Sequence, residues 1–335
     1  MVTPRVSVVI PNFNYSRTLG LCLESIFEQT VQPYEVIVSD DASTDASLEI
    51  AARFPCRVLR SASNRGVSAA RNAGAAASAG DVLFFVDSDE ALARDAIETA
   101  LGLLADNPAL GCVHGIISPA PLIDDGPVEW YRTLHAYHWR KRAVGLTPTA
   151  YFAAAAIRRS VFDAVGPFDE NLRDSEDVEY SNRLSECCEI LLTDRIIAYH
   201  DEESVLWRML REQFRRAQLL IPFAAAHRSR PGALRANSGL GVVSALLTLG
   251  TAPLFLWTPA LALAPAVCAA IFAVSDPGLA RFVIGRRGLR FLGYFTVIHL
   301  LVNAAIGLGA AVGLLRCLLD KDFGPSRTGL AGEEQ

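Results

Sequence analysis

The 335-residue sequence lacks several features that would assign it to common classes of protein. It contains neither G-x-G-x-x-G nor G-x-x-x-x-G-K-[ST], which argues against a dinucleotide oxidoreductase and against a P-loop enzyme. It carries 31 basic and 36 acidic side chains, and a net charge of −5 excludes a strongly basic nucleic-acid-binding protein. We find no cleavable signal at the start of the sequence and no C-x-x-C spacing among its cysteines. We therefore expect the thiols to be reduced, either in the cytosol or buried in lipid. The seven cysteines are Cys22, Cys56, Cys112, Cys187, Cys188, Cys268 and Cys317.

Charged side chains are also absent from two long stretches near the C-terminus, residues 236–275 and 291–315. At about 1.5 Å per residue, the first stretch would extend for roughly 60 Å as a helix, about twice the thickness of a membrane's hydrocarbon layer. We therefore expect membrane spans near 239–256 and 259–275, and a third span at 291–315. The alternatives are a buried helical domain of a soluble protein and a two-span topology with a re-entrant piece.

Arginines flank both stretches and predict the orientation. Short arginine-rich loops stay in the cytoplasm, so both ends of the first stretch should lie inside and the tail after the third span outside. Residues 206–235 predict an amphipathic basic helix and linker on anionic lipid, with Trp207 at the headgroups. Residues 236–319 then form the membrane region, and residues 320–335 form a polar tail.

Residues 1–205 alternate between strand and helix patterns. Short apolar runs at 6–10, 35–39, 57–59 and 81–86 predict strands, and segments 16–30, 47–54 and 66–79 predict helices. This alternation predicts an α/β domain with a parallel sheet and helices on both faces. An aromatic-rich stretch at 130–139 could stack on sugar rings or pack a loop onto the sheet, and the sequence favours neither.

Polar clusters follow three of the predicted strands, at Pro11-Asn-Phe-Asn14, Asp40-Asp41 and Asp87-Ser-Asp89. In such sheets, ligands bind at the carboxyl ends of the strands. Asp41 suits a hydrogen bond from a base, and Asp87 suits ribose hydroxyls. Asp89 points to the same side as Asp87 if the strand continues, and carboxylates with diphosphate oxygens would bind Mg²⁺ or Mn²⁺. The alternative for any such aspartate pair is a solvated turn.

Five segments carry a resemblance to a known family. VSVVIPNFN, EVIVSDDASTD, NRGVSAARNAG and GDVLFFVDSDE resemble, in order and spacing, the opening motifs of family-two glycosyltransferases with the GT-A fold. IRRSVFDAVGPFDENLRDSEDVEYSNRL is similar to the acceptor-side segment of that family. The resemblance covers about residues 4–205 and implies a mixed, mainly parallel sheet sandwiched by helices. It does not specify the C-terminal membrane helices.

The resemblance also implies roles for individual residues. Pro11 and Phe13 would lie at the nucleotide base, and Asp41 would bind the edge of the base. The remaining implied roles are Arg71 near the base or diphosphate, Asp87 on the ribose, Asp89 as a metal ligand, and His200 as a second ligand to the metal or to the diphosphate. A plain histidine at a strand end is the alternative for His200.

Asp177, of Glu176-Asp177, is the general base that the resemblance implies. Inverting transfer needs a carboxylate opposite the leaving group to accept the proton of the acceptor hydroxyl. The sequence pattern predicts that a helix begins at this pair, and a helix N-terminus should keep the acid ionised. The acidic neighbours Asp174, Glu176 and Glu179 compete for the role, and a helix-capping acidic cluster is the alternative.

These features predict an inverting, metal-dependent hexosyl-type glycosyltransferase that uses a nucleotide-diphosphate sugar. Its acceptor would be a hydroxyl of a membrane-associated, lipid-linked glycan in cell-envelope polysaccharide biosynthesis. We expect a multi-pass protein of the cytoplasmic membrane, with its catalytic domain in the cytoplasm, membrane lipid as a partner and no nucleic acid. The alternatives are a polyprenyl-phosphate glycosyltransferase, whose acceptor is already ionised and needs no base, and a non-catalytic nucleotide-sugar-binding scaffold.

Overall fold

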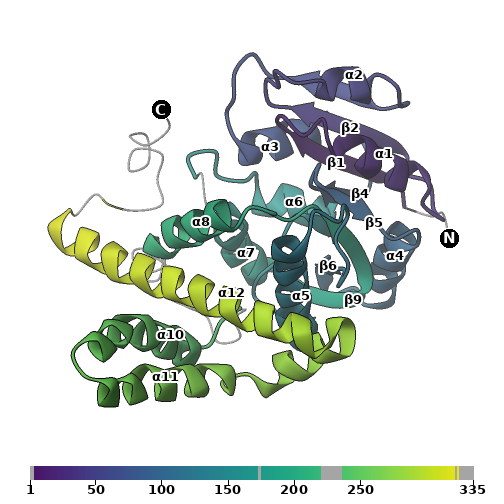
Figure 1. The fold of residues 1–335 in the computed structure, drawn as a ribbon. Helices are drawn as coiled ribbons and strands as arrows, with labels where there is room; N and C mark the ends of the chain where they lie inside the picture. The colour runs from purple at the N-terminus through teal and green to yellow at the C-terminus, as the bar shows by residue number, and fades with distance from the viewer. Residues whose placement is uncertain (1–3, 173–174, 220–235, 321–322, 324–335) are drawn as a thin grey trace. The chain divides into compact units, whose positions relative to one another are not determined.

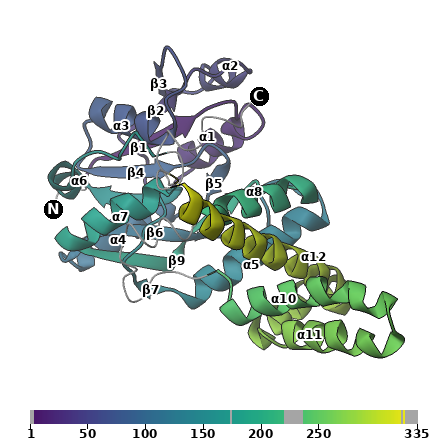
Figure 2. The ribbon, with the colours of Figure 1, turned by 90° about the vertical axis from the view of Figure 1, so that its left-hand side faces the viewer.

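The structure is a computed structural model that describes residues 4–172, 175–219, 236–320 and 323 (Figures 1 and 2). Contacts divide the chain into two compact units. The first, the sheet unit, comprises residues 1–123, 140–201 and 230–234. The second, the helical unit, comprises residues 124–139, 202–229 and 235–335. The predicted boundary after residue 205 therefore lies close to a division after residue 201, but segment 124–139 groups with the helical unit, which the sequence did not indicate.

The sheet unit is built on one mixed sheet with the strand order β3-β2-β1-β4-β8-β6-β9-β5, and β7 pairs with β9. Its strands are β1 (Val6–Asn12), β2 (Glu35–Asp40), β3 (Arg57–Arg60), β4 (Val82–Val86), β5 (Glu90–Leu92), β6 (Leu110–Ile117), β7 (Gly145–Leu146), β8 (Ala154–Arg158) and β9 (Glu189–His200). Its helices are α1 (Leu19–Phe27), α2 (Ser47–Ala51), α3 (Val67–Ala77), α4 (Ala96–Asp106), α6 (Arg159–Val165) and α7 (Glu176–Cys187). The predicted strands and helices of residues 6–86 are confirmed, with ends that differ by a few residues.

Two apolar cores lie on opposite faces of this sheet, because successive side chains of a strand point to opposite faces. In β1, Val8 and Ile10 belong to one core and Val9 to the other. In β4, Phe84 belongs to the first core and Phe85 to the second. Strands that are buried on both faces are typical of a sheet covered by helices on both sides, which explains their mainly apolar sequence.

The topology brings several strand ends to one edge of the sheet. Strands β2, β1 and β4 run parallel to one another. Strand β8 is antiparallel to β4 and to β6, so β6 runs in the same direction as β4, and β9 is parallel to β6. The carboxyl ends of β1, β2, β4 and β9 therefore lie at the same edge, and the predicted polar clusters follow the first three of these ends.

The helical unit contains α8 (Leu206–Gln218), α10 (Gly239–Thr251), α11 (Leu263–Ala273) and α12 (Pro277–Leu319). It also contains the short 3₁₀ helices η1 (Ala252–Leu256) and η2 (Pro259–Ala262), and residues 127–139 of α5 (Pro127–Arg142). Helix α12 is interrupted at Gly288, whose φ of 79° is non-helical. The apolar core of the helical unit consists of side chains from α5, α8 and α12, among them Tyr131, Leu134, Met209 and Phe295.

Two helices of the described chain are long and apolar enough to cross a membrane, judged by length and composition alone. They are Gly239–Leu256 and Pro277–Leu319. Only 17% of the first segment is buried, unlike the core helix of a soluble protein, which is mostly buried. The second predicted span, 259–275, contains the shorter helix α11. Residues 220–235 of the predicted linker, and all of the predicted tail except residues 320 and 323, lie outside the described residues.

Candidate functional site

The predicted base-binding residues lie where β1 and β2 end. Pro11 is buried within β1, whereas the ring of Phe13 is 40% exposed. The backbone N–H of Asp41 donates to the carbonyl oxygen of Asn12, which holds the two strand ends together. Asn14 adopts a positive φ of 60°, and its side-chain oxygen accepts from the backbone N–H of Thr44 at 2.8 Å. This bond ties the loop that carries Phe13 to the loop that follows β2.

The Asp41 carboxylate is buried and organises the approach to α3. It accepts backbone N–H bonds from Arg65 at 2.8 and 2.9 Å and from Gly66 at 2.6 Å. Gly66 has a φ of 95°, a conformation that favours glycine directly before the helix. A carboxylate offers about four acceptor positions, so these bonds leave Asp41 able to accept one more from a ligand.

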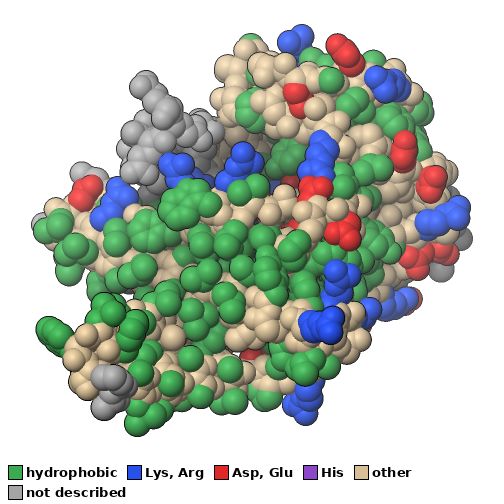
Figure 3. Space-filling model, in the orientation of Figure 1, with side chains coloured by type: hydrophobic (Ala, Val, Ile, Leu, Met, Phe, Trp, Pro, Cys, Tyr) green, Lys and Arg blue, Asp and Glu red, His purple; other side chains and the backbone are tan. Residues whose placement is uncertain are grey.

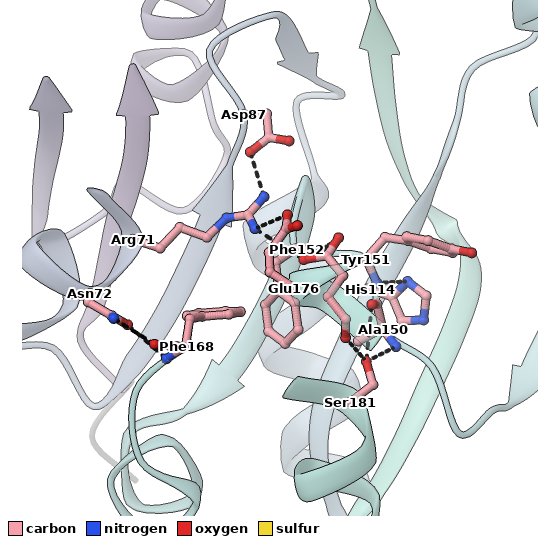
Figure 4. A network of polar contacts seen from close by, with 11 residues as sticks. Arg71, Asn72, Asp87, His114, Ala150, Tyr151, Phe152, Phe168, Glu176 and Ser181 are labelled. Atoms are coloured by element: carbon pink, nitrogen blue, oxygen red, sulfur yellow. Dashed lines mark hydrogen bonds and ion pairs between the residues drawn. The ribbon is translucent and has the colours of Figure 1, made fainter. Parts of the chain in front are cut away.

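Arg71 forms the centre of a second cluster, which Figure 4 shows from close by. Arg71 lies in α3, and only 2% of its side chain is exposed. Its guanidinium pairs with three carboxylates from two other parts of the chain. Its nitrogens lie 3.0 Å from Asp87 Oδ1, 3.3 Å from Glu176 Oε1 and 3.1 Å from Asp177 Oδ1. We call Arg71, Asp87, Glu176 and Asp177 the Arg71 cluster. The resemblance placed Arg71 near the base or diphosphate. In the structure its guanidinium holds these carboxylates together, and the implied role near the base or diphosphate stays a prediction.

Asp177 lies in the first turn of α7, and its second carboxylate oxygen faces residues 150–152, the segment before β8. Asp177 Oδ2 accepts the backbone N–H of Phe152 at 3.4 Å. The neighbouring N–H of Ala150 donates to Ser181 Oγ at 2.8 Å, and the N–H of Tyr151 lies 3.4 Å from His114 Nδ1. Three successive backbone groups are thus bonded to side chains from α7 and β6 (Figure 4). These bonds fix the orientation of Asp177.

Burial dominates the electrostatics of the cluster. It raises the pKa of Asp177 to about 7, against the attraction of Arg71 and with the repulsion of Glu176 and Asp87. Burial likewise raises the pKa of Asp87, although Arg71 opposes the shift. Burial therefore opposes the effect of the helix N-terminus, which we expected to keep Asp177 ionised. A pKa near neutrality suits a general base, which must both accept and release a proton.

Asp89 and His200 form a third group. Strand β4 ends at Val86, so Asp87 and Asp89 lie in a turn before β5, and the strand alternation that would place them on one side does not extend through them. Strand pairing sets Glu90 opposite His200, and the N–H of Asp201 donates to the carbonyl oxygen of Asp89. His200 Nε2 consequently lies 3.6 Å from Asp89 Oδ2. The register of β5 and β9 thus joins two residues that are far apart in the sequence.

The donor set of Asp89 and His200 fits a divalent transition metal, since carboxylate oxygen and imidazole nitrogen both bind Mn²⁺. The described residues contain no group of three or more His, Cys, Asp or Glu side chains that could hold a metal ion. A metal at this pair would need further ligands, and diphosphate oxygens are suitable ones. Mg²⁺ fits less well, because it prefers oxygen ligands throughout.

Sequence reasoning missed two features of the site. It did not anticipate that Arg71 would pair with Asp87, Glu176 and Asp177, and the one available signal was a single charged residue in a helix of mostly small side chains. It did not single out Glu90, which is 2% exposed and whose pKa burial raises to about 8, with His200 opposing the shift. The competing acid Asp174 lies outside the described residues, and Glu179 instead pairs with Arg183 at 2.7 Å.

Residues 7–166 match the family model for glycosyl transferase family 2. The chain contains a family 2 glycosyltransferase domain. The matched range of the family 2 domain includes all three predicted polar clusters, at 11–14, 40–41 and 87–89, and ends before Asp177 and His200. The assignments of Asp177 and His200 therefore depend on the geometry and on the resemblance.

Curated relatives of the family 2 domain bear glycosyltransferase names. An uncharacterized glycosyltransferase of Haemophilus influenzae is 28% identical over 188 residues, which are 53% of this chain and 61% of that protein. The pre-mycofactocin glycosyltransferase of Mycobacterium tuberculosis is 29% identical over 257 residues, 73% of this chain and 53% of that protein. The chain thus spans between about half and three fifths of the length of these two relatives.

Solved structures support the fold. The mannosyltransferase PcManGT from Pyrobaculum calidifontis, in complex with GDP-Man and Mn2+, superposes with a TM-score of 0.58 at 21% identity, covering 96% of this chain and 89% of that one. Residues 1–349 of TarS from S. aureus superpose with a TM-score of 0.50 at 17% identity, covering 92% of each chain. The predicted GT-A class of α/β fold, with its mixed and mainly parallel sheet between helices, is confirmed.

Proposed function

We propose that this protein is an inverting glycosyltransferase that moves a sugar from a nucleotide-diphosphate donor to a hydroxyl group. The observation that carries the proposal is the Arg71 cluster. One guanidinium holds Asp87, which directly follows strand β4 of the family 2 domain, together with Asp177 at the start of α7. Such a cluster sets a donor-binding carboxylate and a candidate base at a fixed separation, which a displacement at one carbon requires.

In this proposal the donor lies along the edge of the sheet. The exposed ring of Phe13 would stack on the base, with Pro11 behind it and Asp41 accepting from the edge of the base. Asp87 would accept the ribose hydroxyls. Asp177 would accept the proton of the acceptor hydroxyl as that oxygen bonds to the anomeric carbon and the bond to the diphosphate breaks. Its raised pKa makes the Asp177 carboxylate a stronger base for the hydroxyl proton than an ordinary aspartate would be.

Asp89 and His200 would hold a divalent cation, preferably Mn²⁺, together with the diphosphate. When bound, the cation neutralises the charge that develops on the departing nucleoside diphosphate. The Mn2+ complex of PcManGT supports this part of the proposal at the level of the shared fold.

Asp177 favours a hydroxyl acceptor over a phosphate acceptor. A polyprenyl phosphate is already ionised at neutral pH and needs no base, whereas a sugar hydroxyl does. We propose a lipid-linked glycan of the cell envelope as the acceptor, because the helical unit exposes apolar side chains suited to lipid. The arginines around the apolar stretches support a position at the cytoplasmic face of the membrane.

The test is donor turnover by the purified full-length chain in detergent. With Mn²⁺ and a panel of nucleotide-diphosphate sugars, the wild type should hydrolyse or transfer one donor, and EDTA should stop the reaction. Asp177→Asn should lower turnover by about 10²–10⁴-fold, the usual contribution of a general base, while nucleoside diphosphate still binds. Asp163→Asn is the matched control, since Asp163 is exposed on α6 outside the cluster. Near-normal turnover in Asp177→Asn would refute the assignment of the base. No turnover of any donor by the wild type would favour the scaffold alternative.

A further inference from the structure

Helix α12 has polar helices packed against both of its halves, which is unexpected for a membrane span. Residues 127–139 of α5 line the first half. The ring of Tyr137 lies 5.4 Å from that of Phe282, and the ring of Tyr131 lies 4.8 Å from that of Phe295. Tyr131 Oη also lies within hydrogen-bond distance, 2.9 Å, of His299 Nδ1.

Helix α8 lines the second half at close range. A Cβ atom added to Gly309 would clash with the carbonyl oxygen of Phe214, and one added to Gly313 would clash with the carbonyl oxygen of Gln218. Arg316 Nη1 donates to Gln218 Oε1 at 2.9 Å. Because small residues let helix backbones approach, the two glycines fix α8 against α12. Together α5 and α8 accompany α12 from residue 282 to residue 316.

The helix that lines the second half carries exposed charges. Helix α8 exposes Arg208, Arg211, Arg215 and Arg216, with Trp207 73% exposed beside them. If residues 291–315 crossed a bilayer, α8 would enter the hydrocarbon with them, since it lies beside Gly309 and Gly313. Arginine side chains at that depth are strongly unfavourable, whereas at the headgroups they bind anionic lipid.

The opposite side of α12 faces an apolar hairpin made of α10 and α11. A Cβ atom on Gly307 would clash with Leu246 of α10, and Ala304 shares a core with Ala245 and Phe272. No charged residue occurs between Ala236 and Ser275. The hairpin exposes large apolar side chains, namely Leu240, Val243, Leu247, Val267, Ile271 and, at its tip, Trp257. On the face drawn in Figure 3, hydrophobic side chains gather over α12 and the hairpin.

We infer that α12 lies along the membrane surface instead of crossing it, with α5 and α8 on its headgroup side and the α10–α11 hairpin on its hydrocarbon side. The helical unit then occupies one leaflet of an anionic bilayer, and its arginines contact lipid phosphates. The hairpin enters and leaves the bilayer on the same side. The C-terminus therefore lies on the side of the family 2 domain, which is opposite to the location that three spans predict.

Reporter fusions at the two ends of the full-length chain test this inference. Green fluorescent protein folds only in the cytoplasm of a bacterial host, and alkaline phosphatase is active only outside it. Membrane fractions should contain the protein, both N- and C-terminal fluorescent fusions should fluoresce, and a C-terminal phosphatase fusion should be inactive. An active C-terminal phosphatase, or a protein found only in the soluble fraction, would overturn the inference.

Depth measurements provide a second test that does not depend on the fusions. Val297, Leu308 and Leu315 are exposed on α12, and an upright helix would separate the first and last by roughly 27 Å in depth. Spin labels at these positions, in vesicles of phosphatidylglycerol and phosphatidylcholine, should report similar depths by oxygen and nickel-chelate accessibility. A steady change in depth from Val297 to Leu315 would contradict the inference. Neither test requires catalysis, so loss of donor turnover in Asp177→Asn leaves both results interpretable.

Discussion

Replacing Arg71 with methionine removes the one positive charge of the Arg71 cluster and keeps a side chain of similar length. The guanidinium is 2% exposed and pairs with Asp87, Glu176 and Asp177, of which the two aspartates have raised pKa values. Without Arg71, carboxylates that repel one another stay desolvated near each other. The sheet unit should therefore lose stability well beyond what the loss of a surface ion pair would cause.

Breaking a buried ion pair by removing one partner typically costs about 3–5 kcal/mol. For a unit of about 200 residues, 1 kcal/mol shifts the melting temperature by about 2–4 °C, so the shift should be roughly 6–20 °C. The sign of the pH dependence follows from Asp177. Its folded-state pKa lies above the unfolded value, so the folded state holds its proton more tightly, and stability falls as the pH rises from about 4 towards 7. The variant should strengthen this effect and be most destabilised at pH 8.

Scanning calorimetry of the full-length chain in detergent, at pH 5 and pH 8 without donor or metal, would measure both effects. Arg5→Met is the matched control, because Arg5 and Asp81 are 51% and 56% exposed and form only a surface ion pair at 3.6 Å. The control should change the free energy of unfolding by at most about 1 kcal/mol. If Arg71→Met behaved like Arg5→Met, or if it were less stable at pH 5 than at pH 8, our account of the cluster would be refuted.

Three further predictions follow from the same geometry. Asp177→Asn should make the free energy of unfolding less dependent on pH between 5 and 8, since the group with the raised pKa is gone; an unchanged slope in calorimetry would contradict this. Asp89→Asn should abolish the Mn²⁺-dependent rise in melting temperature that a nucleoside diphosphate gives the wild type, and a full rise would remove Asp89 from the metal site. Gly74→Ala should destabilise the sheet unit by about 1–3 kcal/mol, because the added Cβ would clash with Val9. The Cβ added by Gly102→Ala in α4 meets no atom within 4 Å, so this substitution should stabilise the sheet unit by about 0.5–1 kcal/mol. Denaturant titrations measure both changes.

The central strands could be predicted from the sequence because their burial leaves a local trace. Strand β4 is an uninterrupted apolar run, β1 is apolar except for Ser7 and Asn12, and both faces of each strand are buried. The role of segment 124–139 could not be predicted in this way. Its aromatic side chains fit sugar binding and loop packing equally well, and their actual partners lie on α12, more than 140 residues later in the chain. Hydrophobic periodicity identifies an apolar face but does not identify what covers it.

The same limit applies to the candidate site. Asp41, Asp87 and Asp89 could be found because they follow apolar strands directly. The contact between Asp89 and His200 depends on the register of β5 against β9, and no local pattern encodes that register. The pairing of Arg71 with Asp177 joins α3 to α7 across about a hundred residues, and an arginine is ordinarily expected at the surface. The three-dimensional arrangement, and not the motif, therefore assigns Arg71 its present role.

The grouping of residues 124–139 with the helical unit has a practical consequence for protein production. The chain leaves the sheet unit at residue 123, contributes one helix to the helical unit, and returns at residue 140. A fragment truncated after residue 205 would retain that helix but lose α12, which covers Tyr131 and Leu134. Such a fragment would present a bare aromatic surface and should aggregate, so a soluble catalytic fragment calls for redesign of this helix and not only for a shorter gene.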